Sequence, residues 1–419
     1  GLGDVYKRQF VYIVKKEEDI MKKFNKFLSV AVASAMVMSM AGCGNTDNGS
    51  AATGTNAATE SAASGSVFKI GGIGPTTGGA AVYGLAVQHG AEIAVEEINA
   101  AGGINGYQIE FKFQDDEADA EKSVNAYNAL KDWGAQIIDG STTSGACIAV
   151  TDKTKEDNMF QITPSGSAVE CVQYDNNFRV CFSNPNQGLA SAQYIGENGL
   201  AEKIAVIYDS SDVYSSGIYE KFVKEAENQP FEVVAAEAFT ADNKTDFSVQ
   251  LQKAKDAGAD MVFLPIYYQE SALILTQAAA MGYAPKWFSC DGMDGILGGV
   301  DNFDVSLTEG VMLLTPFAAD ATDDLTQSFV TKYKEKYGET PNQFAADSYD
   351  AIYVIKAAIE KSGVTPDMSV SDICDGMKAA MTEITVDGLT GNGMTWTADG
   401  EANKAPKAVV IENGAYKAM

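Results

Sequence analysis

Few side chains in this sequence could act as nucleophiles, bases or metal ligands. The chain has one histidine, His89, and six cysteines, none of them in a C-x-x-C pair. A Ser-His-Asp or Cys-His mechanism would need His89 as its base. That residue falls in a predicted helix beside Gly90, where we expect a surface or packing role. The chain also lacks a G-x-S-x-G motif and a Walker phosphate loop. We therefore expect no enzyme activity, no metal and no cofactor.

The glycine-rich segment GGIGPTTGG, residues 71–79, lies between a predicted strand and a predicted helix. A dinucleotide-binding loop takes that place, but the spacing here is G-x-G-x-x-x-G rather than G-x-G-x-x-G. The acidic strand end at Asp115 also lies about twice too far along the chain. The glycines suit instead a loop whose backbone amides, at a helix N-terminus, face a small ligand.

The cysteines comprise Cys43 near the N-terminus and five others in the body of the chain. An odd number predicts at least one free thiol or an intermolecular bridge. Cys171 and Cys181 flank a short stretch that contains YDNNFRV. They could close a small loop in an oxidising compartment, and two free thiols are the equal alternative. The other three are Cys147, Cys290 and Cys374.

The region that begins at Met21 has the layout of a secretory signal peptide. Basic residues precede an apolar run, residues 27–40, that is shorter than the roughly 20 residues a membrane-spanning helix needs. The run ends in Met-Ala-Gly-Cys43, which resembles the bacterial lipobox, a motif whose cysteine is lipidated at the new N-terminus. An ordinary signal with a chance cysteine is the alternative.

This layout divides the N-terminal region into three segments. We expect residues 1–20 to be a non-native extension and residues 21–42 to be the lipoprotein signal peptide. Residues 43–66 then supply the lipidated Cys43 and a flexible tether, because they are nearly all Gly, Ser, Ala, Thr and Asn. The expected location is extracytoplasmic, with a lipid anchor in the cell membrane.

The composition of the chain limits what its remaining part can bind. About 350 residues follow the tether, more than one hydrophobic core usually serves, so two domains are expected. A net charge of −27 opposes binding to nucleic acid or to anionic lipid surfaces. With 46% hydrophobic and 10% aromatic residues, the chain is globular rather than disordered.

Short strand patterns alternate with helical patterns from residue 67 onward. In the first half we expect strands at 68–74, 107–116, 136–139 and 159–163, and helices at 80–101, 120–133 and 144–157. The alternation then restarts, with strands at 203–209, 231–239, 260–266 and 310–317, and helices at 214–228, 247–257, 270–281, 326–337 and 344–361. A final hairpin, 407–411 with 415–417, turns at Asn413-Gly414. This order predicts an α/β fold with two parallel-sheet lobes covered by helices on both faces.

The segment IGGIGPTTGGAAVYGLAVQHGAEIAVEEINAAGGINGYQIEFKFQDDEAD resembles the opening of the type I periplasmic binding proteins of the leucine/isoleucine/valine-binding group. The resemblance continues through FQITPSGS, VIYDSSDVYSSG, VFLPIYYQE and CDGMDG, and it covers residues 68–419. It implies two doubly wound lobes joined by a three-strand hinge, in the Venus-flytrap architecture. Lobe one would take residues 67–186 and 318–395, and lobe two residues 187–317 and 396–419.

The resemblance also implies a function and partners. Such proteins close over an amino acid and deliver it to the permease and ATPase of an ABC importer, and we expect a monomer. A ligand-sensing protein, or one that binds another amide or small acid on the same fold, is the alternative.

The resemblance further implies a set of ligand-binding residues. Thr143 and Ser144, at a helix start, and Ser165 and Ser167, in TPSGS, match contacts to the head group of an amino acid; capping and turn roles are the alternative. Asp291 matches the partner of the ammonium group, with Asp294 as its rival in the same loop.

Aromatic residues complete the implied site. Tyr267 matches a tyrosine that closes over the ligand, with Tyr268 as its rival. Three further rings match positions around the side-chain pocket, namely Tyr83, Tyr214 and Phe344. Core packing is the alternative for these three. No cationic residue lines the implied pocket, which disfavours an acidic ligand side chain and favours a neutral amino acid. The resemblance implies that this amino acid is branched-chain.

Overall fold

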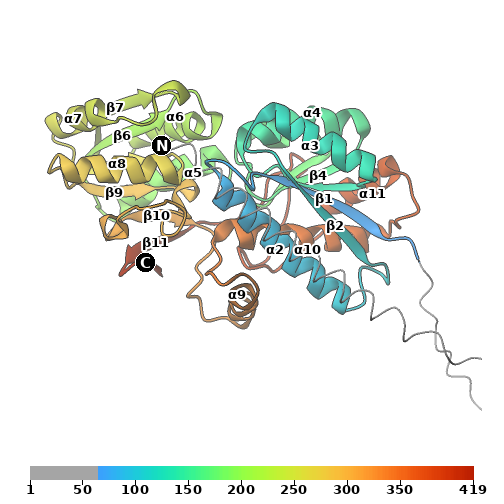
Figure 1. The fold of residues 1–419 in the computed structure, drawn as a ribbon. Helices are drawn as coiled ribbons and strands as arrows, with labels where there is room; N and C mark the ends of the chain where they lie inside the picture. Colours follow the sequence, from blue (N-terminus) through green and yellow to red (C-terminus); the bar gives the residue numbers. More distant parts are fainter. Residues whose placement is uncertain (1–64) are drawn as a thin grey trace, which may run out of the picture. The chain divides into compact units, whose positions relative to one another are not determined.

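Two β-sheets, each flanked by helices, form the part of the chain that the computed structural model describes, residues 65–419 (Figure 1). The signal peptide and Cys43 predictions fall outside the described residues, as does nearly all of the predicted tether. The first sheet has the order β2-β1-β3-β4-β5, and all its pairings are parallel. Its strands are β1 (Phe68–Gly74), β2 (Ile109–Asp115), β3 (Ile137–Asp139), β4 (Phe160–Thr163) and β5 (Asn177–Arg179).

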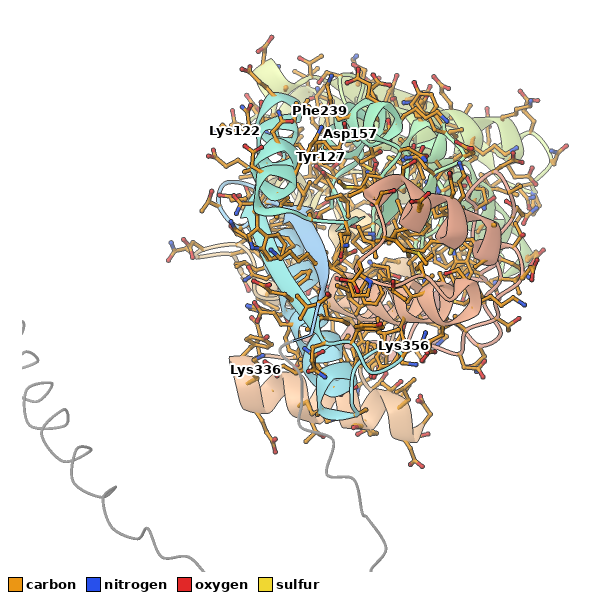
Figure 2. All side chains as sticks on the ribbon, turned by 90° about the vertical axis from the view of Figure 1, so that its right-hand side faces the viewer. Lys122, Tyr127, Asp157, Phe239, Lys336 and Lys356 are labelled. Atoms are coloured by element: carbon orange, nitrogen blue, oxygen red, sulfur yellow. The ribbon has the colours of Figure 1, made fainter. Side chains whose placement is uncertain are left out.

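Helices from distant parts of the sequence cover the first sheet. They are α2 (Ala81–Ala100), α3 (Ala120–Trp133), α4 (Ser144–Asp157), α9 (Asp324–Tyr337), α10 (Gln343–Ser362) and α11 (Val370–Met381). On one face α3 packs on α4, where the Tyr127 hydroxyl donates to Asp157 at 2.7 Å (Figure 2). On the other face α2 packs on α10 so closely that a Cβ at Gly90 would lie 2.0 Å from the Ala345 carbonyl oxygen. We call this sheet and its helices the first lobe.

The second sheet has the order β12-β11-β10-β9-β8-β6-β7. The strands from β6 to β10 pair in parallel, whereas β11 and β12 form an antiparallel edge. The strands are β6 (Lys203–Asp209), β7 (Glu232–Phe239), β8 (Met261–Leu264), β9 (Lys286–Ser289), β10 (Met312–Thr315), β11 (Lys407–Glu412) and β12 (Ala415–Ala418). We call this sheet and its helices the second lobe.

Four helices accompany the second sheet, α5 packed on α6 and α7 in contact with α8. They are α5 (Asn184–Glu197), α6 (Val213–Ala226), α7 (Ser248–Asp256) and α8 (Tyr268–Ala280). Short 3₁₀ turns occur in the connections, namely η1 (Val169–Val172), η2 (Ala241–Asn243), η3 (Asp291–Met293) and η4 (Val305–Thr308).

The chain passes between the two sheets three times: after β5, after β10 and before β11. The first and third passages lie side by side, because the Trp396 indole donates to the Arg179 carbonyl at 2.7 Å and the Arg179 amide donates to the Gly400 carbonyl at 3.0 Å. The two lobes of the predicted α/β fold are therefore confirmed, with β11 and β12 as an antiparallel addition to the second sheet. The residue boundaries proposed for the lobes stay a proposal.

The strands and helices predicted from the sequence agree with the structure to within two residues at their ends. Four further elements escaped prediction. β5 and β9 have only three and four residues, and helix α5 opens on the polar stretch Asn-Pro-Asn-Gln-Gly. Helix α11 is the fourth, and it contacts α10 and β4.

A buried ion pair ties the third passage to the first lobe. The Lys404 Nζ lies 2.8 Å from the Asp347 carboxylate of α10, and their side chains are 1% and 3% exposed. Lys404 also donates to the Val180 carbonyl at 3.1 Å, on the first passage. Burial raises the pKa of Asp347 to about 7, and the ammonium of Lys404 opposes that rise. The pair therefore holds two of the three passages against α10.

Replacing one member of this pair should destabilise the fold more than replacing both. Lys404→Met leaves the Asp347 carboxylate buried without a cation, and we expect the free energy of unfolding to fall by about 3–5 kcal/mol. Combining it with Asp347→Leu removes the uncompensated charge and should restore much of that loss. Urea unfolding followed by circular dichroism measures both variants. A double variant no more stable than Lys404→Met would show that the charge is not the cause.

Candidate functional site

A small cavity lies where the two lobes meet. It is lined by Tyr83, Thr142, Thr143, Ser144, Ser165, Tyr214, Tyr267, Asp291, Gly292 and Phe344. Eight of the nine residues predicted from the sequence therefore surround one space, and Ser167 is the exception. This cleft cavity encloses about 20 Å³, room for about one water molecule. A larger ligand needs the walls to move apart, as a hinge between two lobes allows.

Four aromatic rings form the apolar wall of the cleft cavity. The Tyr83 ring of α2 lies 4.4 Å from Phe344 of α10 and 5.6 Å from Tyr267, measured between ring centres. Tyr214, in the first turn of α6, stacks on Tyr267 at 5.0 Å. Tyr268, the rival of Tyr267, meets Tyr83 edge-on at 5.1 Å but does not line the cavity.

The Tyr83 hydroxyl links the first lobe to the second. It donates to the Gly292 carbonyl in η3 and accepts the Tyr268 amide, at 3.2 Å from its nitrogen, at the start of α8. Both partners belong to the second lobe, whereas Tyr83 belongs to the first. These two bonds exist only while the lobes are together, so Tyr83 acts as a latch across the cleft.

A buried carboxylate, Asp291, faces the cavity from the second lobe. Its Oδ1 accepts the Tyr214 hydroxyl at 2.6 Å, and its Oδ2 accepts the Gln187 amide at 2.8 Å. Burial raises the pKa of Asp291 to about 6, although these two hydrogen bonds lower it. The rival Asp294 does not line this cavity. Asp291 is therefore the acidic group available to a ligand in the cleft.

The N-terminus of helix α4 faces the same cavity from the first lobe. Thr143 precedes the helix, and its buried Oγ1 has no hydrogen-bond partner within residues 65–419. The first amides of a helix lack partners within that helix and carry partial positive charge. The Ser165 hydroxyl donates to the Thr142 carbonyl at 2.7 Å and so joins this polar side. The arrangement can hold an anionic group.

The two remaining predicted serines also build the loop beside the cavity, which Ser144 lines and Ser167 does not. The Ser144 Oγ accepts the amides of Ser167 and Ala168, both at 3.1 Å, which is the role of a loop-fixing side chain. Ser167 lies behind it, 3.5 Å away between hydroxyl oxygens. The fully buried Arg179 donates to the Gly166 and Ala168 carbonyls, at 3.2 and 2.8 Å. Ser144 and Arg179 together fix the position of Ser165.

The glycine-rich loop acts differently from what its pattern indicates. The Thr76 and Thr77 amides donate to the Asp115 carboxylate, at 2.8 and 3.4 Å, instead of facing a ligand. The Thr77 hydroxyl binds the same carboxylate. The loop contributes by holding the start of α2, and thereby Tyr83, at the cleft. For these two amides the expectation was wrong, because a carboxylate from the neighbouring strand occupies them.

The five cysteines of the described region are buried free thiols. The loop disulfide considered for Cys171 and Cys181 is therefore not formed. The Cys171 thiol donates to the Ser144 carbonyl at 3.7 Å and packs beside Cys147 instead. His89 has a packing role, since its ring stacks on Tyr337 at 3.7 Å. Within residues 65–419 no cluster of metal-ligating side chains occurs, and no helix is long and apolar enough to span a membrane.

The mouth of the cleft is acidic. The mouth is an adjoining space of about 340 Å³ that shares Thr143 and Tyr267 with the cleft cavity. Its charged lining residues are Glu117, Asp209, Asp212, Glu270 and Lys244. Lys244 is itself paired with Glu270 at 3.2 Å. Four carboxylates against one paired ammonium favour the approach of cationic groups and oppose anionic ones.

Comparison with known proteins identifies the family to which this chain belongs. Residues 67–415 match the model of a family described as periplasmic binding protein. The chain belongs to the periplasmic binding protein family. A Leu/Ile/Val-binding protein homologue from Brucella melitensis is 30% identical over 300 residues, 71% of this chain and 80% of that one. A leucine-, isoleucine-, valine-, threonine- and alanine-binding protein from Pseudomonas aeruginosa is 30% identical over 303 residues, 71% of this chain and 79% of that one.

Solved structures agree with this assignment. A branched-chain amino acid transporter substrate-binding protein from Streptococcus pneumoniae, in complex with isoleucine, is 28% identical with a TM-score of 0.75, and the match covers 84% of this chain and 99% of that one. A solute-binding protein from R. palustris in complex with benzoate has a TM-score of 0.74 at 20% identity, with 84% and 95% of the two chains covered. The second likeness shows the fold alone.

These matches confirm the resemblance of the sequence to type I periplasmic binding proteins of the leucine/isoleucine/valine group. Periplasmic binding proteins are extracytoplasmic solute-binding proteins of transporters rather than enzymes. Sequence reasoning did not find Arg179 and Gln187 in this binding protein. Their only signal was a charged residue in an otherwise buried stretch, NFRVCF, and a polar helix start, NPNQG.

The latch predicts that Tyr83→Phe opens this binding protein. The variant keeps the ring but leaves the Gly292 carbonyl and the Tyr268 amide without partners when the lobes are together. We expect the closed state to lose about 1 kcal/mol for each bond, with a larger radius of gyration in small-angle X-ray scattering. Tyr353→Phe is the matched control, because its hydroxyl bonds to Glu97 within the first lobe. Identical scattering from both variants would argue against the latch.

Proposed function

We propose that this protein is the solute-binding lipoprotein of an ABC importer, and that it binds a neutral, branched-chain amino acid between its lobes. One observation carries the proposal: the cleft cavity sets the Asp291 carboxylate of one lobe against the α4 N-terminus of the other. An amino acid head group has a cation and an anion one carbon apart. Such a head group complements both walls at once and thereby draws the lobes together.

The charges of the two walls favour a zwitterion over a simple acid. A carboxylate ligand could bind the α4 amides and the Thr143 hydroxyl, but it would leave the buried Asp291 without a cation. Two buried negative charges in one cavity are unfavourable unless one is protonated. The acidic mouth adds to this opposition. The benzoate of the R. palustris neighbour is therefore a poor guide to the ligand of this chain.

The aromatic wall supports a neutral ligand side chain. Tyr83, Tyr214, Tyr267 and Phe344 offer ring surfaces, and no Lys or Arg lines the cleft cavity among the described residues. An acidic side chain would find no counterion there. The named relatives from Brucella melitensis and Pseudomonas aeruginosa, whose names include leucine, isoleucine and valine, favour a branched aliphatic side chain.

Delivery of the ligand completes the proposal. We infer that Cys43 carries a lipid and that the Gly/Ser-rich stretch after it tethers the lobes to the membrane beside the permease and ATPase of the importer. A short tether raises the effective concentration of the binding protein near its transporter. Mass spectrometry of the native N-terminus tests this inference, and a mature protein that retains residues 21–42 would contradict it.

A titration panel tests the class of ligand. We expect leucine, isoleucine or valine to bind in isothermal titration calorimetry, whereas 4-methylpentanoate, which has the leucine skeleton without the ammonium, should bind at least about 100-fold more weakly. The reason is that Asp291 stays unpaired with the second ligand. Benzoate serves as the comparison for the aromatic acids. If 4-methylpentanoate or benzoate bound as tightly as every amino acid in the panel, the proposed ligand class would be wrong.

The Asp291 carboxylate also predicts a pH dependence of affinity. Its pKa in the free protein is raised to about 6, and a bound ammonium should lower it, so binding below pH 6 must release a proton. Affinity is then constant above about pH 6 and falls by up to about tenfold per pH unit below it. Asp291→Asn should weaken binding about 10- to 100-fold at pH 7.5 and flatten the profile.

The groups around Asp291 require a control for that profile. Tyr214 and Gln187 contact Asp291 directly, and the Asp294 carboxylate raises its pKa further. Burial also raises the pKa of Asp212, at the mouth, to about 6. Asp212→Asn is therefore the matched control and should keep both the affinity and the pH dependence. If Asp212→Asn lost the pH dependence instead, the titrating group would be Asp212 at the mouth rather than Asp291.

A further inference from the structure

A second, larger cavity of about 510 Å³ shares no lining residue with the cleft cavity. Its walls come from both lobes: α2 and α9 on one side, and the 294–299 loop, β10, β11 and β12 on the other. Apolar side chains line much of it, among them Leu85, Leu297, Leu313 and Phe317. Its volume falls within the range of small-molecule sites, about 300–1,000 Å³.

One buried carboxylate, Asp294, lines this second cavity. The residue is 5% exposed, and its Oδ2 accepts a hydrogen bond from the backbone amide of Gln343 at 2.9 Å. Its Oδ1 is buried and has no hydrogen-bond partner in the described part of the chain. The Tyr416 hydroxyl is a nearby donor, and its influence on the pKa of Asp294 opposes the increase that burial causes. A buried carboxylate oxygen without a partner is unfavourable unless a donor or cation reaches it.

The two cavities share one wall. In α2, Tyr83 faces the cleft cavity, whereas Val82 and Ala86 face the second cavity. In the loop after β9, Asp291 and Asp294 divide in the same way. Gln343, at the start of α10, joins both, since its amide donates to Asp294 and its side chain donates to the Asp291 carbonyl at 3.0 Å. The two cavities are therefore separated by a wall whose residues are bonded to one another.

We propose that the second cavity binds a small amphiphilic amine, with its ammonium on Asp294 and its apolar body against Leu297, Leu313 and Phe317. An ammonium supplies a charge that compensates this buried carboxylate, and the net charge of −27 favours the approach of cations. The other charged residues in the lining are two lysines and two acids, Lys334, Lys417, Asp320 and Glu339. The lining thus has three carboxylates and two ammonium groups, a balance that favours a cationic ligand over an anionic one.

The position of the cavity also gives its ligand an effect on the cleft. Because its walls belong to both lobes, an occupant that contacts both stabilises the arrangement in which they are together. The amine should therefore raise the affinity of the cleft for its amino acid, about fivefold or more. This consequence rests on the proposed function of the cleft, whereas binding of the amine does not.

Titration of the full chain with hexylamine, without any amino acid, tests the site. Hexan-1-ol is the neutral comparison with the same apolar body, and we expect the amine to bind at least about tenfold more tightly. Asp294→Asn should abolish that preference. Equal binding of the two probes, or an unchanged preference in Asp294→Asn, would overturn the proposal.

A cavity-filling variant separates this site from non-specific binding. Leu297→Trp places a larger side chain in the second cavity and should reduce hexylamine affinity at least tenfold. Leu273→Trp is the matched control, because Leu273 is 38% exposed on α8 and lines none of the cavities described above. Thermal melting followed by circular dichroism confirms that both variants fold. Equal hexylamine binding by both variants would show that the amine lies elsewhere.

A final titration measures the coupling between the two cavities. With hexylamine at saturation, the affinity for leucine should rise about fivefold, and an unchanged affinity would overturn the coupling. If leucine and the other amino acids fail to bind at all, the proposed function of the cleft fails, whereas the hexylamine titrations still decide whether the second site exists.

Discussion

The desolvated carboxylate of Asp291 is the constraint on which the cleft depends. In water a carboxylate is strongly hydrated, and burial between two lobes removes that hydration. The hydrogen bonds from Tyr214 and Gln187 replace only part of it, which is why the pKa of Asp291 remains raised to about 6. In the proposed function, the ammonium group of the ligand supplies the remaining compensation. The charge on Asp291 therefore opposes closure of the empty cleft and favours closure around an ammonium.

The rest of the structure keeps the opposing wall in place. An anion site made of helix amides and hydroxyls is useful only if the loop beside it cannot move. Ser144 and Arg179 provide that rigidity through bonds to the amides and carbonyls of residues 166–168. The Lys404–Asp347 pair then fixes the passages between the lobes against α10, which also carries Phe344. Buried charges thus hold the first lobe and the two passages beside it in place.

The sequence was most informative where one physical pattern dominates. Apolar strand segments alternate along the sequence with segments of helical periodicity, and this alternation predicted both sheets. The reason is that a buried strand in a parallel sheet is usually followed by a helix that covers the sheet. β5 and α5 escaped because their buried positions hold Asn, Arg and Gln, whose burial depends on partners distant in the chain. The role of Arg179 has the same cause, since its guanidinium contacts the Gly166 and Ala168 carbonyls and the Glu401 carboxylate, which lies 3.4 Å away on a distant segment of the chain.

The site residues divide in a similar way. The resemblance to a family matched Asp291 and Tyr267 to site positions, but it left Asp294 and Tyr268 as rivals. Those choices depend on which way a short 3₁₀ turn and a helix start direct each side chain. The structure directs Asp291 and Tyr267 into the cleft cavity and Asp294 into the second one. A spacing of three residues in one loop thus directs Asp291 and Asp294 into two different cavities.

Two opposing contributions set how far the empty protein closes. The Tyr83 latch favours the closed state through two hydrogen bonds between the lobes, whereas the unpaired charge of Asp291 opposes it. A latch that is too strong would close the cleft without a ligand, and entry would then require an unfavourable opening. A latch that is too weak would leave only a small fraction of molecules closed. The apparent affinity would then fall in proportion to that fraction. In the proposed function the ammonium cancels only the unfavourable contribution, so ligand binding shifts this balance without changing the latch, and closure then reports that the cleft is occupied.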